Sequence, residues 1–330
     1  MTGFFLKKFV NIPLLFIFFL PSNFFIPQTI SDNNPELCFV VYSKNAFYGL
    51  NLDNSVGEIR FRIETQNQHR VLFIDQFKSD AYQTVAAIND QGTFISYFFF
   101  DDQISQISPT NFTEIFGSLL FDQISIPSAE NIHLLSNSLL IDNSSQVFAD
   151  ENQKGYIIRT INGNSEVLEN KNPSLINNGL NLTTPSSESI NGFYHPYQQK
   201  KRVASEINKR ISEFSIQDGF VVLESAQSQQ DMIASVVFDP ENNLIYLAFD
   251  KDFSKIWLIN LDGETIETFS GFERYHKGNI PNIGITANDL RILNFSNEGL
   301  MVRIIIGAIG ILIIILATIL VHIRFKKIFQ

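Results

Sequence analysis

Apolar and β-branched runs separated by turn residues dominate the first part of the chain after residue 37 and predict β-strands. Residues 38–42 read Cys-Phe-Val-Val-Tyr, residues 43–45 are turn formers, and an extended pattern resumes over residues 46–53. These two runs therefore predict a hairpin. Four further strands are expected, at residues 58–64, 71–75, 84–88 and 93–100.

A helical period replaces this pattern in the middle of the chain. Apolar residues three and four apart predict helices over residues 113–121 and 132–140, whereas residues 147–159 and 165–169 return to extended structure. The most regular case is residues 197–214, where Val203, Ile207 and Ile211 recur every four positions between basic residues. This spacing predicts an amphipathic helix.

Strand patterns return in the last third, at residues 233–239, 243–249, 255–261 and 265–269, with good turn formers between them. Strands, helices and again strands predict an α+β sandwich. A β-propeller blade is the competing interpretation of residues 235–269. The helices in the middle and the lack of a repeated blade favour the sandwich.

The C-terminal region contains an uncharged apolar run at residues 304–323, which as a helix is about 30 Å long and matches the hydrocarbon core of a bilayer. Three cationic residues, Arg324, Lys326 and Lys327, follow the run, and only Arg303 precedes it. Because cytoplasmic flanks are enriched in such residues, residues 304–323 are predicted to form a transmembrane helix, followed by a cytoplasmic tail at 324–330.

The N-terminal region has the layout of an export signal, with Lys7 and Lys8 before an apolar run over residues 9–20. Residues 1–26 are therefore expected to be a signal peptide, with an uncleaved signal anchor as the alternative, and residues 27–37 a candidate propeptide. Residues 38–298 would then form one ectodomain. The predicted location is the cell membrane, with a single pass and the ectodomain outside.

Composition narrows the function classes. A net charge of −10 and a pI near 5.0 argue against a nucleic-acid-binding surface, which needs a basic stripe. Cys38 is the single cysteine, which excludes a disulfide framework and a cysteine-clustered metal site. The histidines show no zinc-binding spacing. No metal or organic cofactor is expected.

Cys38 is the candidate nucleophile because of its position. A lone cysteine that opens a strand is usually a small core residue. Cleavage between Leu37 and Cys38, however, would give it a free α-amine with a pKa of about 7.7 to 8.0, a suitable base beside its own thiol. Such a site also needs a carboxylate to orient the amine and donors to an oxyanion. The hairpin is expected to bring Asp53 back beside Cys38.

Several motifs in this order resemble the cysteine N-terminal-nucleophile (Ntn) hydrolases, the family of choloylglycine hydrolase, penicillin V acylase and the linear amide hydrolases. The family opens with a Cys, then Gly-Arg-Asn-x-Asp, then an Asn-Glu-x-Gly turn. The matching segments here are Cys38-Phe39-Val40-Val41, residues 49–53, 87–92, 148–150 with 155–158, 175–178 and 234–240. The resemblance implies an αββα sandwich of two antiparallel sheets covered by helices.

The resemblance also implies an activity, hydrolysis of a linear N-acyl amide of a small or lipid-like molecule through a thioester acyl-enzyme. In that activity Cys38 is the nucleophile with its own α-amine as the base, Asp53 holds that amine, and Asn178 donates to the oxyanion. Backbone N–H groups within residues 97–99 would be the second donor. Asn177 and Asn181 are the alternatives to Asn178. Three further matching positions are expected to bind substrate or support the site: Asn51, Asn89 and Lys200.

Two positions depart from the family pattern. Leu50 stands where the family has an arginine beside Asn-x-Asp, and Lys200 stands where a second arginine opens the later helix. A guanidinium holds two hydrogen-bond partners in a rigid planar geometry. A lysine replaces this interaction with a looser one, and a leucine cannot replace it at all. A second hypothesis therefore remains, a catalytically degenerate surface protein that keeps the fold for a binding or structural role.

Overall fold

The structure is a computed structural model that describes residues 37–53, 58–78, 80–99, 117, 119–121, 131, 144–161, 164–169, 174–177, 196–226, 232–295 and 309. The chain divides into two units, Met1–Asn33 and Asn34–Gln330, and every described residue belongs to the second. The predicted signal peptide, residues 27–36 of the candidate propeptide and the helix at 132–140 lie outside the described residues, as does the run 304–323 apart from Ile309. Leu37, the last residue of the candidate propeptide, is described and is part of a strand. In the described portion, no helix combines the length and apolar character needed to cross a bilayer.

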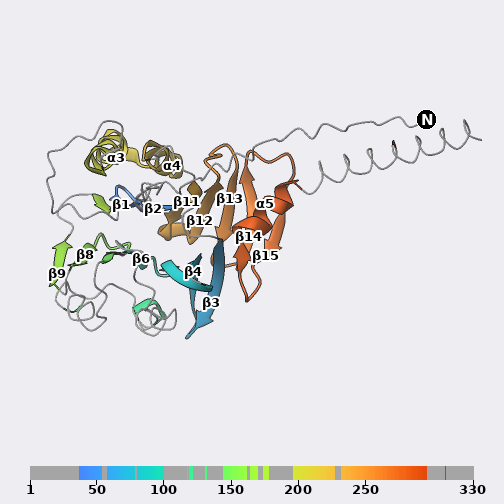
Figure 1. The fold of residues 1–330 in the computed structure, drawn as a ribbon, viewed down its shortest axis with the longest axis horizontal. Coiled ribbons are helices and arrows are strands. Elements are labelled where there is room, and N and C mark those ends of the chain that lie inside the picture. Colours follow the sequence, from blue (N-terminus) through green and yellow to red (C-terminus); the bar gives the residue numbers. More distant parts are fainter. Residues whose placement is uncertain are drawn as a thin grey trace, which may run out of the picture. The chain divides into compact units, whose positions relative to one another are not determined.

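Two antiparallel sheets of eight strands each form the framework of the described part of the chain (Figure 1). The strands of the first sheet are, in spatial order, β10 (Ser174–Asn177), β1 (Leu37–Tyr42), β2 (Ala46–Asp53), β11 (Met232–Asp239), β12 (Leu244–Phe249), β13 (Ile256–Asn260), β14 (Thr265–Ser270) and β15 (Lys277–Asn279). The predicted hairpin of β1 and β2 lies near one edge of this sheet. Every residue of β1 is buried, which explains why its sequence is a continuous apolar run.

The second sheet lies face to face with the first. Its strands are, in spatial order, β16 (Ile285–Thr286), β3 (Ile59–Gln66), β4 (His69–Lys78), β5 (Ala81–Asn89), β6 (Phe94–Phe99), β7 (Ser144–Ala149), β8 (Gly155–Ile161) and β9 (Asn164–Glu169). Most neighbours in space are also neighbours in sequence, joined by short turns such as the one that Asn89 begins. β16 is the exception, because it returns from the C-terminal part of the chain to pair with β3.

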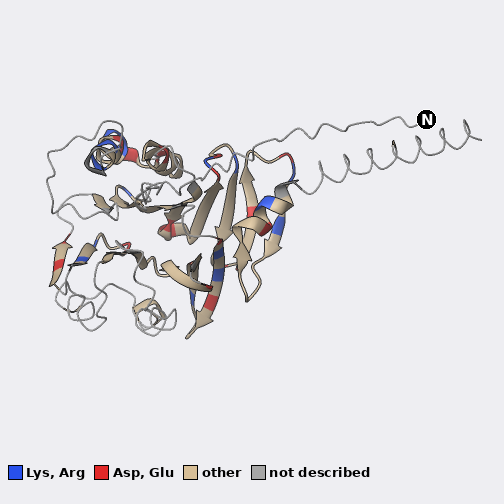
Figure 2. Cartoon of the chain, viewed as in Figure 1, with Lys and Arg blue, Asp and Glu red and all other residues tan. Residues whose placement is uncertain are grey.

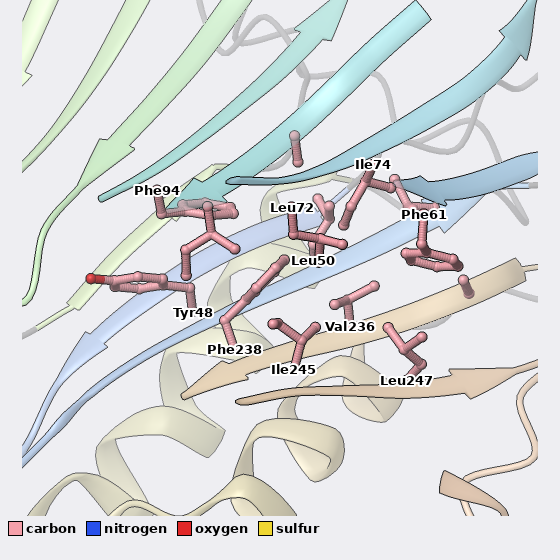
Figure 3. Close-up of a cluster of buried hydrophobic side chains, with 14 of the residues drawn as sticks. Tyr48, Leu50, Phe61, Leu72, Ile74, Phe94, Val236, Phe238, Ile245 and Leu247 are labelled. Carbon is pink, nitrogen blue, oxygen red and sulfur yellow. The ribbon is translucent and has the colours of Figure 1, made fainter. Parts of the chain in front are cut away.

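The main hydrophobic core fills the space between the sheets (Figure 3). Leu50 of β2 and Val236 of β11 project into it from the first sheet, and Leu72 and Phe94 project from the second. Tyr48 closes one part of this core, with its ring stacked on Phe94 at a centroid distance of 5.1 Å. Alternate residues of the central strands therefore point into one apolar layer, as the period of two in the sequence requires.

Two helices cover the outer face of the first sheet: α3 (Pro196–Arg210), which continues through η2 (Ile211–Glu213), and α4 (Ile216–Ser225). The predicted apolar stripe of α3 is confirmed, because Val203 and Ile207 are completely buried against this face. α4 begins with a capping box, in which Ser215 and Asp218 each accept the other's backbone N–H. The sequence reasoning did not predict this helix.

The outer face of the second sheet has its own apolar cluster, in which Leu119, Leu120 and Phe121 pack on strand residues such as Phe73 and Ile158. The first three residues are helical and fall in the segment predicted as a helix over 113–121. Helical residues thus cover both outer faces, and the expected αββα order of layers is confirmed on the residues described. α5 (Ala287–Phe295) follows β16, and η3 (Pro240–Asn242) joins β11 to β12.

The predicted strands are confirmed, with two corrections. Residues 147–159 are not one extended segment but parts of β7 and β8, which pair as a hairpin across the turn at 150–154. The propeller interpretation of residues 235–269 is wrong, because β11 pairs directly with β2 and so continues the sheet of the N-terminal hairpin. A propeller blade would pair only within itself.

A buried carboxylate organises one end of the second sheet and gives a testable prediction. Asp75 of β4 accepts hydrogen bonds from Arg60 Nη2 at 2.8 Å, Arg62 Nε at 2.7 Å and Thr84 Oγ1 at 2.8 Å. Asp75→Asn keeps the shape but removes the charge that both guanidinium groups face, so we expect a loss of about 2 kcal/mol in the free energy of unfolding. Chemical denaturation of the full-length protein measures it.

The matched control for this substitution is Asp262→Asn, since Asp262 is exposed and its carboxylate bonds only weakly to Asn243 at 3.3 and 3.4 Å. Its unfolding free energy should stay within about 0.5 kcal/mol of the parent. Equal effects of the two substitutions would mean that the network around Asp75 does not stabilise the sheet.

Candidate functional site

Cys38 is the second residue of β1 and has a strand on each side. Its register partner on β10 is Asn177, and its partner on β2 is Leu50. Leu37 and Phe39 face α3 and α4, whereas Cys38 faces the space between the sheets. The sulfur therefore lies on the inner side of the sandwich, near the edge formed by β10.

The thiol of Cys38 is completely buried. Burial raises its pKa to about 12, and the nearby side chain of Ser96 acts in the opposite direction. The Sγ atom donates to the Phe39 carbonyl at 4.0 Å, and the Oγ atom of Ser96 has no hydrogen-bond partner in the described part of the chain. Ser96 comes from β6 of the second sheet and is also completely buried. With Leu37 before it, Cys38 therefore carries a neutral thiol at physiological pH, near a hydroxyl group from the opposite sheet.

Ser96 is the nearest functional group to Cys38 that the sequence reasoning missed. The only signal for it in the sequence was a serine at an inward position of an otherwise apolar strand, two residues after Phe94. The sequence reasoning considered backbone N–H groups of residues 97–99 as oxyanion donors, and these follow directly after Ser96 on β6.

Leu50 occupies the position of the family's first arginine, and its surroundings are apolar. It is directly opposite Cys38 on β2, its other register partner is Val236, and its side chain is 1% exposed. Figure 3 shows it pointing into the core with Leu72 nearby. An arginine at position 50 would displace the apolar contacts that Leu50 makes in the core. The departure from the family pattern therefore includes the packing around residue 50 as well as the residue itself.

The structure describes the backbone of Asp53 but not the position of Asn178. Asp53 is the last residue of β2 and pairs with Met232, three positions beyond the partner of Cys38. Asn178 lies outside the described residues, directly after Asn177, the register partner of Cys38 on β10. Both assigned roles remain predictions.

Asn51 and Asn89 are both buried and use their side chains to join elements. Asn51 donates from Nδ2 to the Leu223 carbonyl at 3.0 Å and accepts from Ser235 Oγ at 2.8 Å, which ties α4 to β2 and β11. Asn89 donates to the Leu120 carbonyl at 2.8 Å and accepts backbone N–H groups of its own turn. In this structure both side chains link the secondary-structure elements around the site.

Lys200 lies in the first part of α3 and is half-buried. Burial lowers the pKa of its ammonium group, and the positive charge of Arg159 lowers it further. The side chain that had been considered as a substitute for an arginine is therefore adjacent to an arginine of β8. Within the described ranges, no three His, Cys, Asp or Glu side chains gather as metal ligands.

The architecture is shared with a solved enzyme. Penicillin V acylase from Agrobacterium tumefaciens superposes with a TM-score of 0.50 over 71% of this chain and 91% of that chain, at 9% sequence identity. A variant of conjugated bile acid hydrolase from Clostridium perfringens gives a TM-score of 0.45 at 13% identity, over 71% of this chain and 96% of that chain. An N-acylethanolamine-hydrolyzing acid amidase ortholog from Caenorhabditis elegans gives 0.40 at 12% identity, over 62% and 92%.

No protein-family model matches the sequence, and no curated protein is significantly similar to it. The superposition on penicillin V acylase at this identity identifies the fold, that of the linear amide Ntn hydrolases. The fold that the sequence motifs implied is thus confirmed.

Proposed function

We propose that this protein is an amidohydrolase of linear N-acyl amides and that Cys38, once it becomes the first residue of the mature chain, is its nucleophile. The observation that carries the proposal is the position of Cys38 in a fold shared with penicillin V acylase. It is the second residue of β1, faces the space between the sheets and lies opposite the Asn177 backbone. No other cysteine competes for the role.

In the proposed reaction the α-amine of Cys38 takes the thiol proton, and the sulfur attacks the carbonyl carbon of the amide. The C–N bond then breaks, the proton passes to the leaving amine, and a thioester remains on Cys38. Water next attacks the thioester and gives up a proton to the α-amine, the C–S bond breaks, and the free acid and the thiol are restored. Asp53 would hold the amine, and Asn178 would donate to the oxyanion.

The buried thiol of the unprocessed chain is consistent with a latent precursor. With a pKa near 12, Cys38 supplies almost no thiolate at neutral pH. Removal of the residues before Cys38 would supply a base on the same residue and open the start of β1. Activity should therefore depend on this cleavage.

The test is the N-terminus of the purified full-length protein together with its activity. Intact-mass and peptide mass spectrometry should find a chain that begins at Cys38. That chain should release 4-nitroaniline from octanoyl 4-nitroanilide, whereas protein that retains Leu37 should be inactive. A purified, folded protein that retains Leu37 throughout would overturn the proposal.

A second function has specific support in the packing of Leu50. Because an apolar side chain fills the position of the family's first arginine, the fold could serve binding alone. This alternative predicts that Cys38 remains a buried core residue. A β-lactone acylating probe would then leave the protein unlabelled, while the enzyme would be labelled rapidly and only when Cys38 is present.

Ser96 gives a finer prediction about the same site. Ser96→Ala removes the hydroxyl near Cys38, whose Oγ atom has no hydrogen-bond partner in the described residues and is therefore free to donate to the sulfur during the reaction. A hydrogen bond of this kind contributes about 0.5–1.5 kcal/mol. We expect kcat for octanoyl 4-nitroanilide to fall about two- to tenfold with little change in KM. The pH at which the activity is half-maximal should also rise, because the Ser96 side chain lowers the pKa of the thiol.

Ser96→Cys keeps a weak donor and should recover part of the lost rate. A purely structural role for Ser96 would instead change the thermal stability and leave the pH profile of the remaining activity where it was.

We also propose that the ectodomain is tethered to the outer face of a membrane by residues 304–323. The support is the length and composition of that run and the basic residues after it. Membrane fractionation followed by protease treatment of intact cells tests it. The ectodomain should stay with the membranes through a carbonate wash and be digested from outside.

A further inference from the structure

Arg159 of β8 has buried donor atoms without a hydrogen-bond partner. Its Nε and Nη2 atoms are shielded from solvent, and neither finds an acceptor in the structure that is described. Along β8, Ile157 belongs to the core between the sheets, so Arg159, two residues further on, lies on the same inner face. A buried charged donor without an acceptor is costly, so such a group usually has a partner that binds to it.

A second cation lies beside this one. The pKa of Lys200 is lowered first by burial and then by the charge of Arg159, so the two groups are close and both are partly removed from water. Burial also lowers the pKa of Arg159, while Glu166 acts in the opposite direction. Glu166 is the exposed register partner of Arg159 on β9. Figure 2 shows basic positions on β8 and α3 and acidic ones on β9.

A buried hydroxyl completes the group. Ser145 of β7 is the cross-strand partner of Arg159, is completely buried, and has an Oγ atom without a hydrogen-bond partner in the described part of the chain. Val147 and Ala149, at alternate positions of the same strand, face the core between the sheets, so Ser145 shares the inner face with Arg159. Three polar groups from β7, β8 and α3 therefore converge at one edge of the sandwich.

This group lies near the sulfur of Cys38. Ser96, whose side chain lies near Cys38, is in the same row across the second sheet as Ile157 of β8. Ser145 and Arg159 form the next row on the same face. Successive rows on one face are about 7 Å apart and neighbouring strands about 5 Å apart, so the group is roughly the length of a small molecule away from the sulfur.

The geometry and charge of these donor groups indicate the chemical class of the ligand. The Nε–H and Nη2–H groups of a guanidinium lie on one edge and match the two oxygens of a carboxylate. Arg159 and Lys200 carry two positive charges and Glu166 one negative charge, which leaves the balance for a single monoanion. Ile157, which is two residues before Arg159 on the same face of β8, is apolar and suits the body of the ligand.

We propose that Arg159, Lys200 and Ser145 form a binding site for a carboxylate group of a ligand. As a subsite it rests on the proposed function, because it would hold a carboxylate of the N-acyl amide substrate while the amide lies at Cys38. The binding itself requires no catalysis and can be measured without it.

The experiment compares benzoate with benzamide, which has the same shape and no charge, on the full-length protein by ligand-observed NMR titration at low salt. Benzoate should bind at least about tenfold more tightly, because charge-assisted hydrogen bonds are the strong ones. Arg159→Gln should remove this preference, and Lys200→Gln and Ser145→Ala should each reduce it. Arg159→Lys should recover only part of it, because it restores the charge without the fork.

Glu166→Gln is the matched control, since it alters a charge beside Arg159 without touching the proposed donors. Benzoate affinity should stay the same or rise. Each variant is checked for its fold by near-ultraviolet circular dichroism, and if Arg159→Gln does not fold, Lys200→Gln and Ser145→Ala decide. Equal affinities for benzoate and benzamide, or a preference that survives these substitutions, would overturn the site. Stronger competition by inorganic phosphate than by acetate would overturn the carboxylate assignment.

The same benzoate titration on Cys38→Ser separates this inference from the proposed function, because benzoate binding does not need the thiol. If benzoate is preferred in Cys38→Ser and in the parent protein, but the parent protein hydrolyses no amide, the carboxylate site is supported and the proposed enzyme activity is wrong. Cys38-dependent hydrolysis without benzoate preference would remove the carboxylate site alone.

Discussion

Cys38→Ser is expected to lower the rate of amide hydrolysis by a factor on the order of 10³ or more, a transition-state loss of about 4 kcal/mol. The α-amine can deprotonate a thiol with a reference pKa of about 8.5 to a useful extent at neutral pH, but a serine hydroxyl is far less acidic. The measurement is the release of 4-nitroaniline from octanoyl 4-nitroanilide by the processed full-length protein. The loss should be in kcat.

Two controls separate chemistry from folding in this test. Cys38 is completely buried, so a serine hydroxyl at that place introduces a polar group into the core, whereas Cys38→Ala does not. Both variants should be inactive, and Cys38→Ala should keep a thermal melting curve close to that of the parent. Residual activity in Cys38→Ala comparable to that of the parent would place the nucleophile elsewhere in the chain.

Most strands could be predicted because their sequence patterns report burial. Runs such as the one in β1 are apolar throughout since both faces are covered, and the turns between strands carry strong turn formers. β10 was missed because four residues are too few to show a period. α4 was missed because its Phe220-Val221-Val222-Leu223 stretch is typical of a strand. Its capping box at Ser215 and Asp218 was the available signal.

The candidate site could be predicted only as far as local chemistry reaches. The value of a cysteine that can become N-terminal follows from its own two functional groups, so Cys38 could be singled out without a fold. The residues around Cys38 could not be predicted from the sequence. Ser96 lies near Cys38 across the sandwich, and Arg159 of β8 lies near Lys200 of α3, and no sequence period encodes such proximities.

The register of the hairpin determines which residue lies opposite Cys38, and the sequence alone did not predict that register. The three-residue turn was expected to return Asp53 to Cys38, but the paired strands put Leu50 directly opposite it and Asp53 three positions further on. Because side chains alternate along a strand, the choice of register decides which residue shares the inner face with the sulfur. Leu50 does so, and it is the residue that departs from the family pattern.

Leu50→Arg should therefore be strongly destabilising, by about 4 kcal/mol or more. The side chain of Leu50 is 1% exposed and lies among apolar groups of both sheets, so an arginine would bury a charge with no carboxylate to receive it. A domain of ordinary stability, about 5–15 kcal/mol, would lose much of its folded population. Chemical denaturation of the full-length protein measures the shift.

Leu50→Met is the matched control, because it keeps the volume and apolar character of the side chain and should cost less than about 1.5 kcal/mol. If Leu50→Arg instead unfolds at the same denaturant concentration as Leu50→Met, the position opens onto a polar cavity that can take a guanidinium. Amide hydrolysis that increases in that variant would further mean that the family arginine has been restored to a working site. Strong destabilisation would mean that this chain has rebuilt the neighbourhood of its cysteine around an apolar contact, so that any catalysis must proceed without that arginine.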